Sequence, residues 1–349
     1  MEFGSDFNTV INFRLKAFHP YLPEKSSFFA NGRQALLSIL KHNNFKRIWI
    51  PNYYCYDVVD YLRNENIEIL FYHQWPRLSS NKIYGSIGSI SFAEGDVLLR
   101  VNTFGLNKFK ADASSFAVPV IDDITHDLCG QSAISSTADW CFASLRKTLP
   151  IPEGGILWSP KNHALPSLPQ ATDEINHIVK RRAEAMALKT SYLKNLINNK
   201  EEFLHQFQTT EHELVNSQIS CISNSTKDFL LHFDIQRWYL QKKLNWLLLS
   251  EISSDKAVVI KPDNIETCYP LSLLLLFNTP RQRDIAKEKL ISKAVYPAIL
   301  WKLPVTASVE AMQFSETMMS IPCDARYNQD DILHLKSIIE QVLSDLQNE

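Results

Sequence analysis

Residues 118–158 read VPVIDDITHDLCGQSAISSTADWCFASLRKTLPIPEGGILW, and this stretch indicates the fold class. It contains three short apolar runs, which we predict to be strands at Val118–Ile121, Trp140–Ser144 and Gly155–Trp158. Short, continuous apolar strands separated by longer connections are typical of a largely parallel sheet covered on both faces. Such sheets bind ligands beyond the carboxyl ends of their strands. The residues to inspect are therefore those that directly follow each strand.

The chain before this stretch alternates between helix and strand patterns. Residues 31–42, NGRQALLSILKH, have apolar side chains at helical spacing, and a second helix is predicted at Asp57–Asn64. Strands are predicted at Arg47–Ile50, Ile67–Tyr72 and Val97–Val101. This alternation places the first part of the chain in the α/β class.

The rest of the chain changes character twice. From Thr172 to about Ile252 the pattern is helical and highly charged, and a smaller α+β pattern follows, ending in a helix that begins near the N-cap residue Asn328. We predict a large α/β domain with the N-terminal segment over residues 1–225, and a linker helix with a small C-terminal α+β domain over residues 226–349. The strands predicted in the small domain are Ala257–Ile260, Leu271–Phe277, Ala294–Ile299 and Met318–Pro322.

The composition is that of an ordinary globular protein, with 45% hydrophobic and 21% charged residues. The formal net charge of −2 argues against nucleic-acid binding, which needs a basic stripe. The one basic cluster, Lys180-Arg181-Arg182, is predicted to be a solvated helix face.

The six cysteines lack C-x-x-C spacing, so we expect no zinc or other metal site. Sparse, irregular cysteines suggest reduced thiols and a cytoplasmic location. No signal-peptide pattern is expected at the N-terminus. The most apolar stretch, Leu271–Phe277, is far shorter than the roughly 20 residues that span a bilayer, so no membrane partner is predicted.

Two strand ends carry residues of chemical interest. Lys147 stands three residues after Ser144 and is followed by Glu153-Gly-Gly, a spacing that suits an amine held over an electrophilic carbonyl beside a phosphate-binding hydroxyl. Taken alone, S-x-x-K more often marks a surface lysine. Asp123 follows a buried strand, where a carboxylate either holds a protonated ring nitrogen or caps the next helix.

Two further segments are weaker signals. Gly32 begins the first helix, where backbone N–H groups and the helix dipole favour a phosphate, although many helices begin with glycine and bind nothing. Residues 51–56, PNYYCY, bring aromatic rings that either stack on a ligand or belong to a core or an interface.

The order and spacing of these features resemble the fold-type-I pyridoxal-phosphate (PLP) enzymes, and more narrowly the DegT/DnrJ/StrS group of sugar aminotransferases and their relatives. Residues 31–35 match the family segment S-G-[TR]-x-A, and residues 101–105 are similar to V-H-x-Y-G. Residues 121–123 match I-E-D, and Lys147 with Glu153 reproduces the spacing K-x5-E-G-G. Residues 321–326, IPCDAR, resemble the final strand of the family.

The resemblance implies an aspartate-aminotransferase-like fold, with a mostly parallel seven-stranded sheet between helices and a smaller C-terminal α+β domain. It implies PLP as the cofactor and a catalytic set of Lys147, Asp123 and His126. Lys147 would form the Schiff base, Asp123 would pair with the pyridine nitrogen, and His126, in place of the family's Gln, would contact the phenolic oxygen. The cofactor-binding residues implied are Gly32, Arg33, Tyr54, Tyr56, Asp123, His126, Ser144 and Lys147.

The resemblance also implies the substrates and partners. An amino acid, with glutamate the expected donor, would pass its amino group to a keto acceptor of the kind found on nucleotide-linked keto-sugars, in polysaccharide biosynthesis. Arg33, Arg146 and Arg326 are candidates for the donor carboxylate, because a planar guanidinium binds it bidentately. A homodimer is expected, with the aromatic residues Tyr53–Tyr56 providing exposed surface for the partner.

Two departures from the family pattern leave the acceptor open. Phe142 stands where the family has a phosphate-binding serine, so Ser144 would take over that role, and no G-x-N-x-R segment is found. Two alternatives therefore stay open. One is dehydratase-type PLP chemistry, although the relatives that perform it replace the lysine by histidine. The other is a catalytically silent homologue that binds a partner or a sugar nucleotide.

Overall fold

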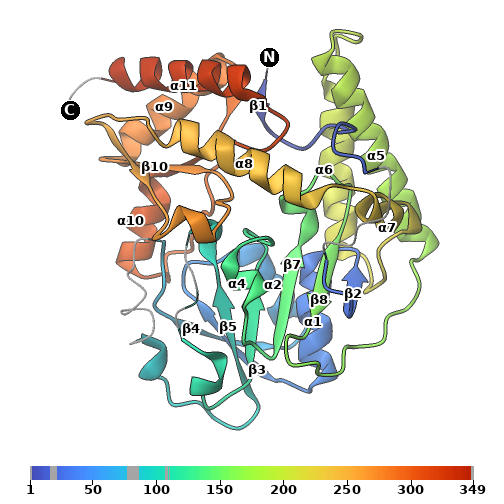
Figure 1. Cartoon of the computed structure of the whole chain (residues 1–349). Helices are drawn as coiled ribbons and strands as arrows, with labels where there is room; N and C mark the ends of the chain where they lie inside the picture. The colour runs from blue at the N-terminus through green and yellow to red at the C-terminus, as the bar shows by residue number, and fades with distance from the viewer. Residues whose placement is uncertain (1, 16–21, 77–85, 107–108, 110, 347–349) are drawn as a thin grey trace.

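The computed structural model describes residues 2–15, 22–76, 86–106, 109 and 111–346, and its largest element is a seven-stranded sheet (Figure 1). The strand order is β2-β8-β7-β6-β5-β3-β4. Strands β7, β6, β5, β3 and β4 are parallel, whereas β8 is antiparallel to β7 and β2 is antiparallel to β8. The predicted mostly parallel sheet of seven strands is confirmed. The strands are β2 (Ser26–Phe29), β3 (Arg47–Pro51), β4 (Glu68–Tyr72), β5 (Asp96–Val101), β6 (Val120–Asp123), β7 (Trp140–Ser144) and β8 (Gly155–Trp158).

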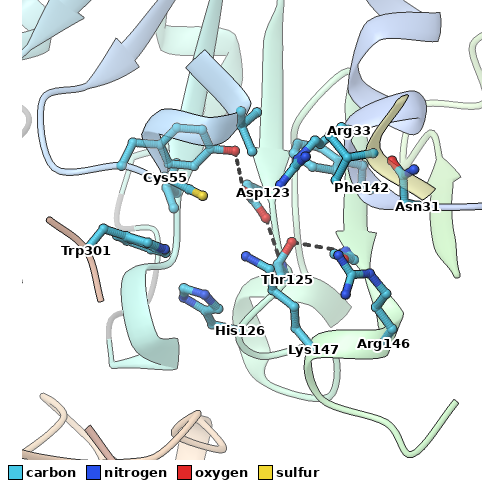
Figure 2. A pocket seen from close by; sticks show the side chains of 16 residues that line it. Asn31, Arg33, Cys55, Asp123, Thr125, His126, Phe142, Arg146, Lys147 and Trp301 are labelled. Atoms are coloured by element: carbon cyan, nitrogen blue, oxygen red, sulfur yellow. Dashed lines mark hydrogen bonds between the residues drawn. The ribbon is translucent and has the colours of Figure 1, made fainter. Parts of the chain in front are cut away.

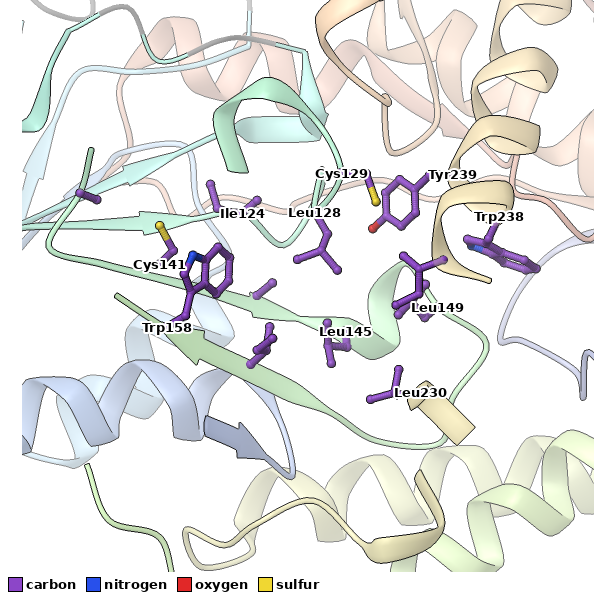
Figure 3. Packing of buried hydrophobic residues seen from close by; sticks show 14 of the residues in the cluster. Ile124, Leu128, Cys129, Cys141, Leu145, Leu149, Trp158, Leu230, Trp238 and Tyr239 are labelled. Atoms are coloured by element: carbon purple, nitrogen blue, oxygen red, sulfur yellow. The ribbon is translucent and has the colours of Figure 1, made fainter. Parts of the chain in front are cut away.

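Both faces of this sheet are covered, which explains why its central strands are continuously apolar. On one face, Val97 and Leu99 of β5 pack with α1 (Gly32–His42) and α2 (Tyr56–Asn64). On the other face, Leu98 belongs to a cluster with Trp238 of α8 (Ile235–Leu249), and Figure 3 shows this cluster around Leu145 and Leu149. Successive strand residues point to opposite faces, so a strand buried on both faces loses the polar alternation of a half-exposed strand.

A long helical hairpin stands beside the sheet (Figure 1). It consists of α5 (Asp173–Leu193) and α6 (Glu201–Asn216), and α7 (Asn224–Leu231) leads on to α8. The prediction that Lys180-Arg181-Arg182 forms a solvated face is wrong for Arg182, which is only 7% exposed. Arg182 lies on the face of α5 that packs against α6, where Phe207 and Thr210 cover it.

The C-terminal part contains an antiparallel sheet of order β12-β10-β9, formed by Met318–Ile321, Leu273–Phe277 and Ala257–Ile260. The strand expected over Ala294–Ile299 is shorter, because β11 is only Val295–Tyr296 and pairs in parallel with β1 (Phe3–Gly4). The N-terminal segment therefore packs against the C-terminal part. Ala298 forms an isolated antiparallel bridge with Ser320 of β12. The helices here are α9 (Pro280–Ser292), α10 (Val309–Thr317) and α11 (Gln329–Ser344).

The predicted start of the last helix is confirmed, since the Asn328 side chain accepts from the N–H of Asp331 in a reciprocal capping box. All six cysteines are free thiols. In the part of the chain that the structure describes, no helix is both long and apolar enough to cross a membrane.

Candidate active site

The carboxyl ends of β5, β6 and β7 meet the N-terminus of α1 around one pocket (Figure 2). Sequence segments that lie far apart contribute to it, as the parallel topology predicts. Of the residues predicted from the sequence, the pocket brings together Gly32, Arg33, Tyr54, Asp123, His126, Ser144, Arg146 and Lys147.

Two adjacent aspartates at the end of β6 have opposite surroundings. Asp122 accepts two hydrogen bonds from Arg100, at 2.8 and 2.9 Å, and one from Ser136 at 2.7 Å. Asp123 points to the other face, into the pocket, because consecutive strand residues alternate. Its carboxylate accepts from the Tyr54 hydroxyl at 2.8 Å and from the N–H of Thr125 at 2.9 Å.

Among the described residues, no Lys, Arg or His lies within ion-pair distance of Asp123. Burial raises the pKa of the Asp123 carboxyl above its ordinary value, although its hydrogen bonds with Thr125 and Tyr54 oppose this shift. A buried carboxylate of this kind is stabilised in its charged form by a cation placed against it. The pocket therefore offers a site for a cationic group of a ligand next to Asp123.

Two glycines bring the start of α1 close to the neighbouring strands. Asn31 caps the helix by accepting from the N–H of Gln34, so the first free donors are the N–H groups of Gly32 and Arg33. A Cβ on Gly32 would lie 2.8 Å from Cβ of Ser144, and one on Gly155 would lie 2.4 Å from the carbonyl oxygen of Asn31. Both glycines are thus needed to bring the helix N-terminus against β7 and β8, with the Ser144 side chain beside it.

Lys147 ends a short 3-10 turn, Leu145–Lys147, that follows β7 directly. Figure 2 shows its side chain reaching into the pocket beside Thr125. The Nζ atom is 5.9 Å from the centre of the Trp301 ring. The hydroxyl of Thr125 accepts from the N–H of Ser144 at 3.1 Å, which ties the end of β7 to the loop after β6. The amine and the Asp123 carboxylate therefore face one cavity from neighbouring strands.

His126 is held as a neutral imidazole with a defined tautomer. Its Nδ1 accepts from the N–H of Phe104 at 2.8 Å, so its proton is on Nε2. Burial, with a smaller contribution from Lys147, lowers the pKa of His126 well below its ordinary value. The ring stacks on Phe104 and on Trp301, with interplanar angles of 13° and 18°. His126 therefore presents a single N–H donor.

Several pocket residues were not predicted from the sequence, and Thr125 and Trp301 are the two that bear most on the geometry of the site. Thr125 lies two positions after Asp123. This short spacing is the only feature of the sequence that could have indicated Thr125 as a pocket residue. Trp301 comes from the C-terminal part, and no motif marks it. It is placed by tertiary contacts, because Tyr53 donates a hydrogen bond to the carbonyl of Leu300 and Ser315 donates to that of Trp301.

The aromatic loop, residues 51–56, does not form the exposed surface that was expected of its tyrosines. Tyr53 and Tyr54 are 0% and 3% exposed within a single chain, so they form core and pocket wall. Tyr56 does not line the pocket. It begins α2, and its ring stacks on Phe71 with centroids 5.9 Å apart.

The three candidate arginines lie in different places. Arg33 and Arg146 line the pocket, Arg33 at 3.8 Å from the exposed Asp57 and Arg146 at 2.6 Å from Glu211. Arg326 lies outside it, because its guanidinium binds Asp324 through two nitrogens at 2.7 and 2.9 Å. Arg326 also donates to the carbonyls of residues 5 and 6, so it anchors the N-terminal segment.

Comparison with known proteins places this arrangement in a structural class. No protein-family model and no curated sequence matches the chain. Solved structures do match: the aminotransferase TlmJ from Streptoalloteichus hindustanus has a TM-score of 0.62 at 10% identity, covering 93% of this chain and 87% of its own. PseC from Helicobacter pylori, an aminotransferase of pseudoaminic acid biosynthesis, has a TM-score of 0.61 at 11% identity, covering 99% and 100%.

A DegT/DnrJ/EryC1/StrS aminotransferase from Brucella abortus is similar at a TM-score of 0.58 and 12% identity, covering 92% of this chain and 87% of its own. At such low identities these likenesses show the fold. The chain has the α/β architecture of PLP fold type I, in the form found in DegT/DnrJ/StrS-type aminotransferases, as its motifs predicted.

Proposed function

We propose that this protein is a PLP-dependent aminotransferase that moves an amino group from an amino acid, glutamate being the expected donor, to a keto substrate. The observation that carries the proposal is the contrast between the two adjacent acids. Asp122 is neutralised by Arg100, whereas Asp123 is buried in the pocket with no cationic side chain of the described residues at ion-pair distance, and it shares that pocket with Lys147. This is the arrangement that a protonated pyridine ring requires.

The other residues of the pocket fit the remaining groups of PLP. The N-terminus of α1 with Ser144 offers donors for a phosphate, and the Nε2–H of His126 offers a donor for a phenolic oxygen. PLP, when bound, supplies a carbonyl that condenses with amines and a ring that accepts electrons. Asp123 would keep the ring nitrogen protonated, and Trp301 and Tyr54 would exclude water from its surroundings.

Lys147 would carry the cofactor and, once a substrate amine displaces it, hold or move the proton at the substrate Cα. A nucleotide-linked keto-sugar remains the proposed acceptor, by analogy with the sugar aminotransferases that share the fold. The presence of lysine, rather than histidine, at position 147 supports transamination over dehydration. A homodimer in which the partner completes the site is part of the same proposal.

The test is to incubate the purified protein with PLP, reduce it with borohydride, digest it and locate the pyridoxyl group by mass spectrometry. Modification of Lys147 supports the proposal, and modification of a different lysine contradicts the site. If no lysine is modified and no visible absorbance of bound cofactor develops, the protein is the silent homologue. Release of 2-oxoglutarate from glutamate in a half-reaction then measures donor turnover.

A further inference from the structure

A second cavity, of about 260 Å³, is also lined by Lys147. It shares Lys147 and Arg146 with the pocket described above, so a ligand in it lies beside the reactive amine. Pockets for drug-sized ligands are typically about 300–1,000 Å³, so this cavity suits a molecule of amino-acid size. It is lined by Ser5, Asp6, Phe7, Arg146, Lys147, Ile151, Arg182, Met186 and Phe207.

Arg182 is the unusual residue in this wall. Its side chain is 8% exposed, and its contacts are long: 3.4 Å to the carbonyl of Phe207, 3.4 Å to the Thr210 hydroxyl and 3.3 Å to Asp6. Charge-assisted hydrogen bonds are normally about 2.7–2.9 Å long. A fourth contact, with Glu211, is 3.2 Å long, so every contact of this guanidinium is longer than a usual charge-assisted hydrogen bond.

Arg146, the second arginine of this wall, has a donor without an acceptor among the described residues. It makes one hydrogen bond, to Glu211 at 2.6 Å, and its Nε is buried without a partner among the described residues. Glu211 is also 3.2 Å from Arg182, so two guanidiniums share one carboxylate. Burial alone would raise the pKa of Glu211, but the two arginines hold it below its ordinary value. Two planar forks of donors thus face a cavity with room for a further anion.

Part of the cavity wall is the N-terminal segment Ser5–Phe7, which other cationic side chains bind. Lys189 donates to the carbonyl of Asp6 at 2.5 Å, and Arg326 donates to the same carbonyl at 3.0 Å. The apolar side chains of Ile151 and Met186 line the cavity beside these polar groups. The surface of the cavity is mainly polar. Arg182 and Arg146 make one part of it cationic, and the Asp6 carboxylate lies 3.3 Å from Arg182 in the same wall.

We propose that this cavity binds the carboxylate of the amino-acid substrate through Arg182 and Arg146, and that Glu211 occupies the two guanidiniums when no substrate is bound. The proposal rests on the proposed function for the identity of the ligand, and it assigns Arg182 a binding role that no sequence motif indicated. We choose a carboxylate over a phosphate, because the N-terminus of α1 offers backbone donors that would suit the phosphate of the proposed cofactor.

Glutarate, which has the carboxylates of the donor and no amine, is the probe. Its dissociation constant is measured by calorimetry for the wild type and for Arg182→Gln, Arg182→Lys, Glu211→Gln and Arg181→Gln. Arg182→Gln removes the charged guanidinium, so it should bind glutarate about tenfold to a hundredfold more weakly than the wild type. Arg182→Lys, which keeps the charge, should lie between the two. The matched control Arg181→Gln removes a neighbouring arginine that pairs with Glu213, and it should bind as the wild type does.

Glu211→Gln should bind glutarate several times more tightly, because it removes the competing carboxylate, and this sign distinguishes a binding role from damage to the fold. Equal binding by wild type and Arg182→Gln would overturn the proposal, as would a wild type that does not bind glutarate. Inorganic phosphate that binds more tightly than glutarate, with loss of this binding in Arg182→Gln, would overturn the choice of a carboxylate. A wild type that binds glutarate but never binds PLP would refute the proposed function and leave the carboxylate site standing.

Discussion

Exchanging Asp123 for Asn removes the negative charge that faces the pocket while keeping the size of the side chain. The amide oxygen can still accept from the N–H of Thr125, and the amide NH₂ can donate to the Tyr54 hydroxyl. Since burial already disfavours the charged form of Asp123, we expect the free energy of unfolding to change by less than about 1 kcal/mol. Activity should fall on the order of 10²- to 10³-fold, the typical loss when one preorganised electrostatic group is removed.

The neighbouring substitution Asp122→Asn should have the opposite profile. It removes the carboxylate that accepts two hydrogen bonds from Arg100, whose side chain is 3% exposed. Breaking a buried ion pair in this way costs about 3–5 kcal/mol of stability. Because Asp122 points away from the pocket, the activity of the protein that remains folded should stay close to that of the wild type.

Urea unfolding gives the stability of each variant, and the half-reaction with glutamate gives activity per folded molecule with PLP in excess. The expected result is a crossed pattern, in which one variant loses activity and the other loses stability. If Asp122→Asn loses activity while Asp123→Asn remains nearly normal, the assignment of the two faces of β6 is wrong. If Asp123→Asn is fully active, a charge at that position does not take part in the reaction.

Three further outcomes are expected. Lys147→Ala should abolish borohydride trapping and transamination. Its free energy of unfolding should change by less than about 0.5 kcal/mol, because the Lys147 side chain is exposed. A trapped pyridoxyl group in this variant would contradict the assignment of Lys147. Burial raises the pKa of Glu153 from 4.5 to about 7, so the folded protein holds this proton more tightly than the unfolded chain and stability falls as the pH rises between these values. The wild type should therefore lose on the order of 2–3 kcal/mol of its free energy of unfolding between pH 5 and pH 7, and Glu153→Gln should abolish this loss, as urea unfolding at the two pH values would show. An unchanged pH dependence in the variant would refute the raised pKa of Glu153. Light scattering should give twice the chain mass of 40.1 kDa, and an active monomer would contradict a shared site.

Much of the fold could be predicted because the signals are local. The strands Trp140–Ser144, Gly155–Trp158 and Ala257–Ile260 have the predicted ends, since each is a short apolar run between turn residues. Strand β2 was not predicted, because Ser26–Phe29 has neither a continuous apolar run nor a clear alternation. The strand over Ala294–Ile299 was predicted too long, because β11 pairs only over two residues with the N-terminal strand β1, a pairing across almost the whole chain.

Some residues of the candidate site could be predicted from local sequence signals, and others depend on contacts between distant segments. Gly32, Asp123 and Lys147 could be predicted because each follows or begins a regular element that brings it to one edge of the sheet. Arg326 has a suitable side chain at a plausible position, but its donors are taken by Asp324 and by the N-terminal segment. A sequence gives the residue type and spacing, whereas the availability of a guanidinium depends on contacts between segments far apart in the chain.

The aromatic loop illustrates how such contacts change an interpretation. A run of tyrosines beside a site suggested an exposed patch for a partner, but Tyr53 is buried between Phe104, Phe314 and Trp301. Its hydroxyl holds the carbonyl of Leu300, and this places Trp301 against His126. One wall of the pocket is therefore fixed by the packing of the C-terminal part against this loop. The prediction of a dimer no longer has support from exposed aromatic surface and depends on the resemblance to aminotransferases alone.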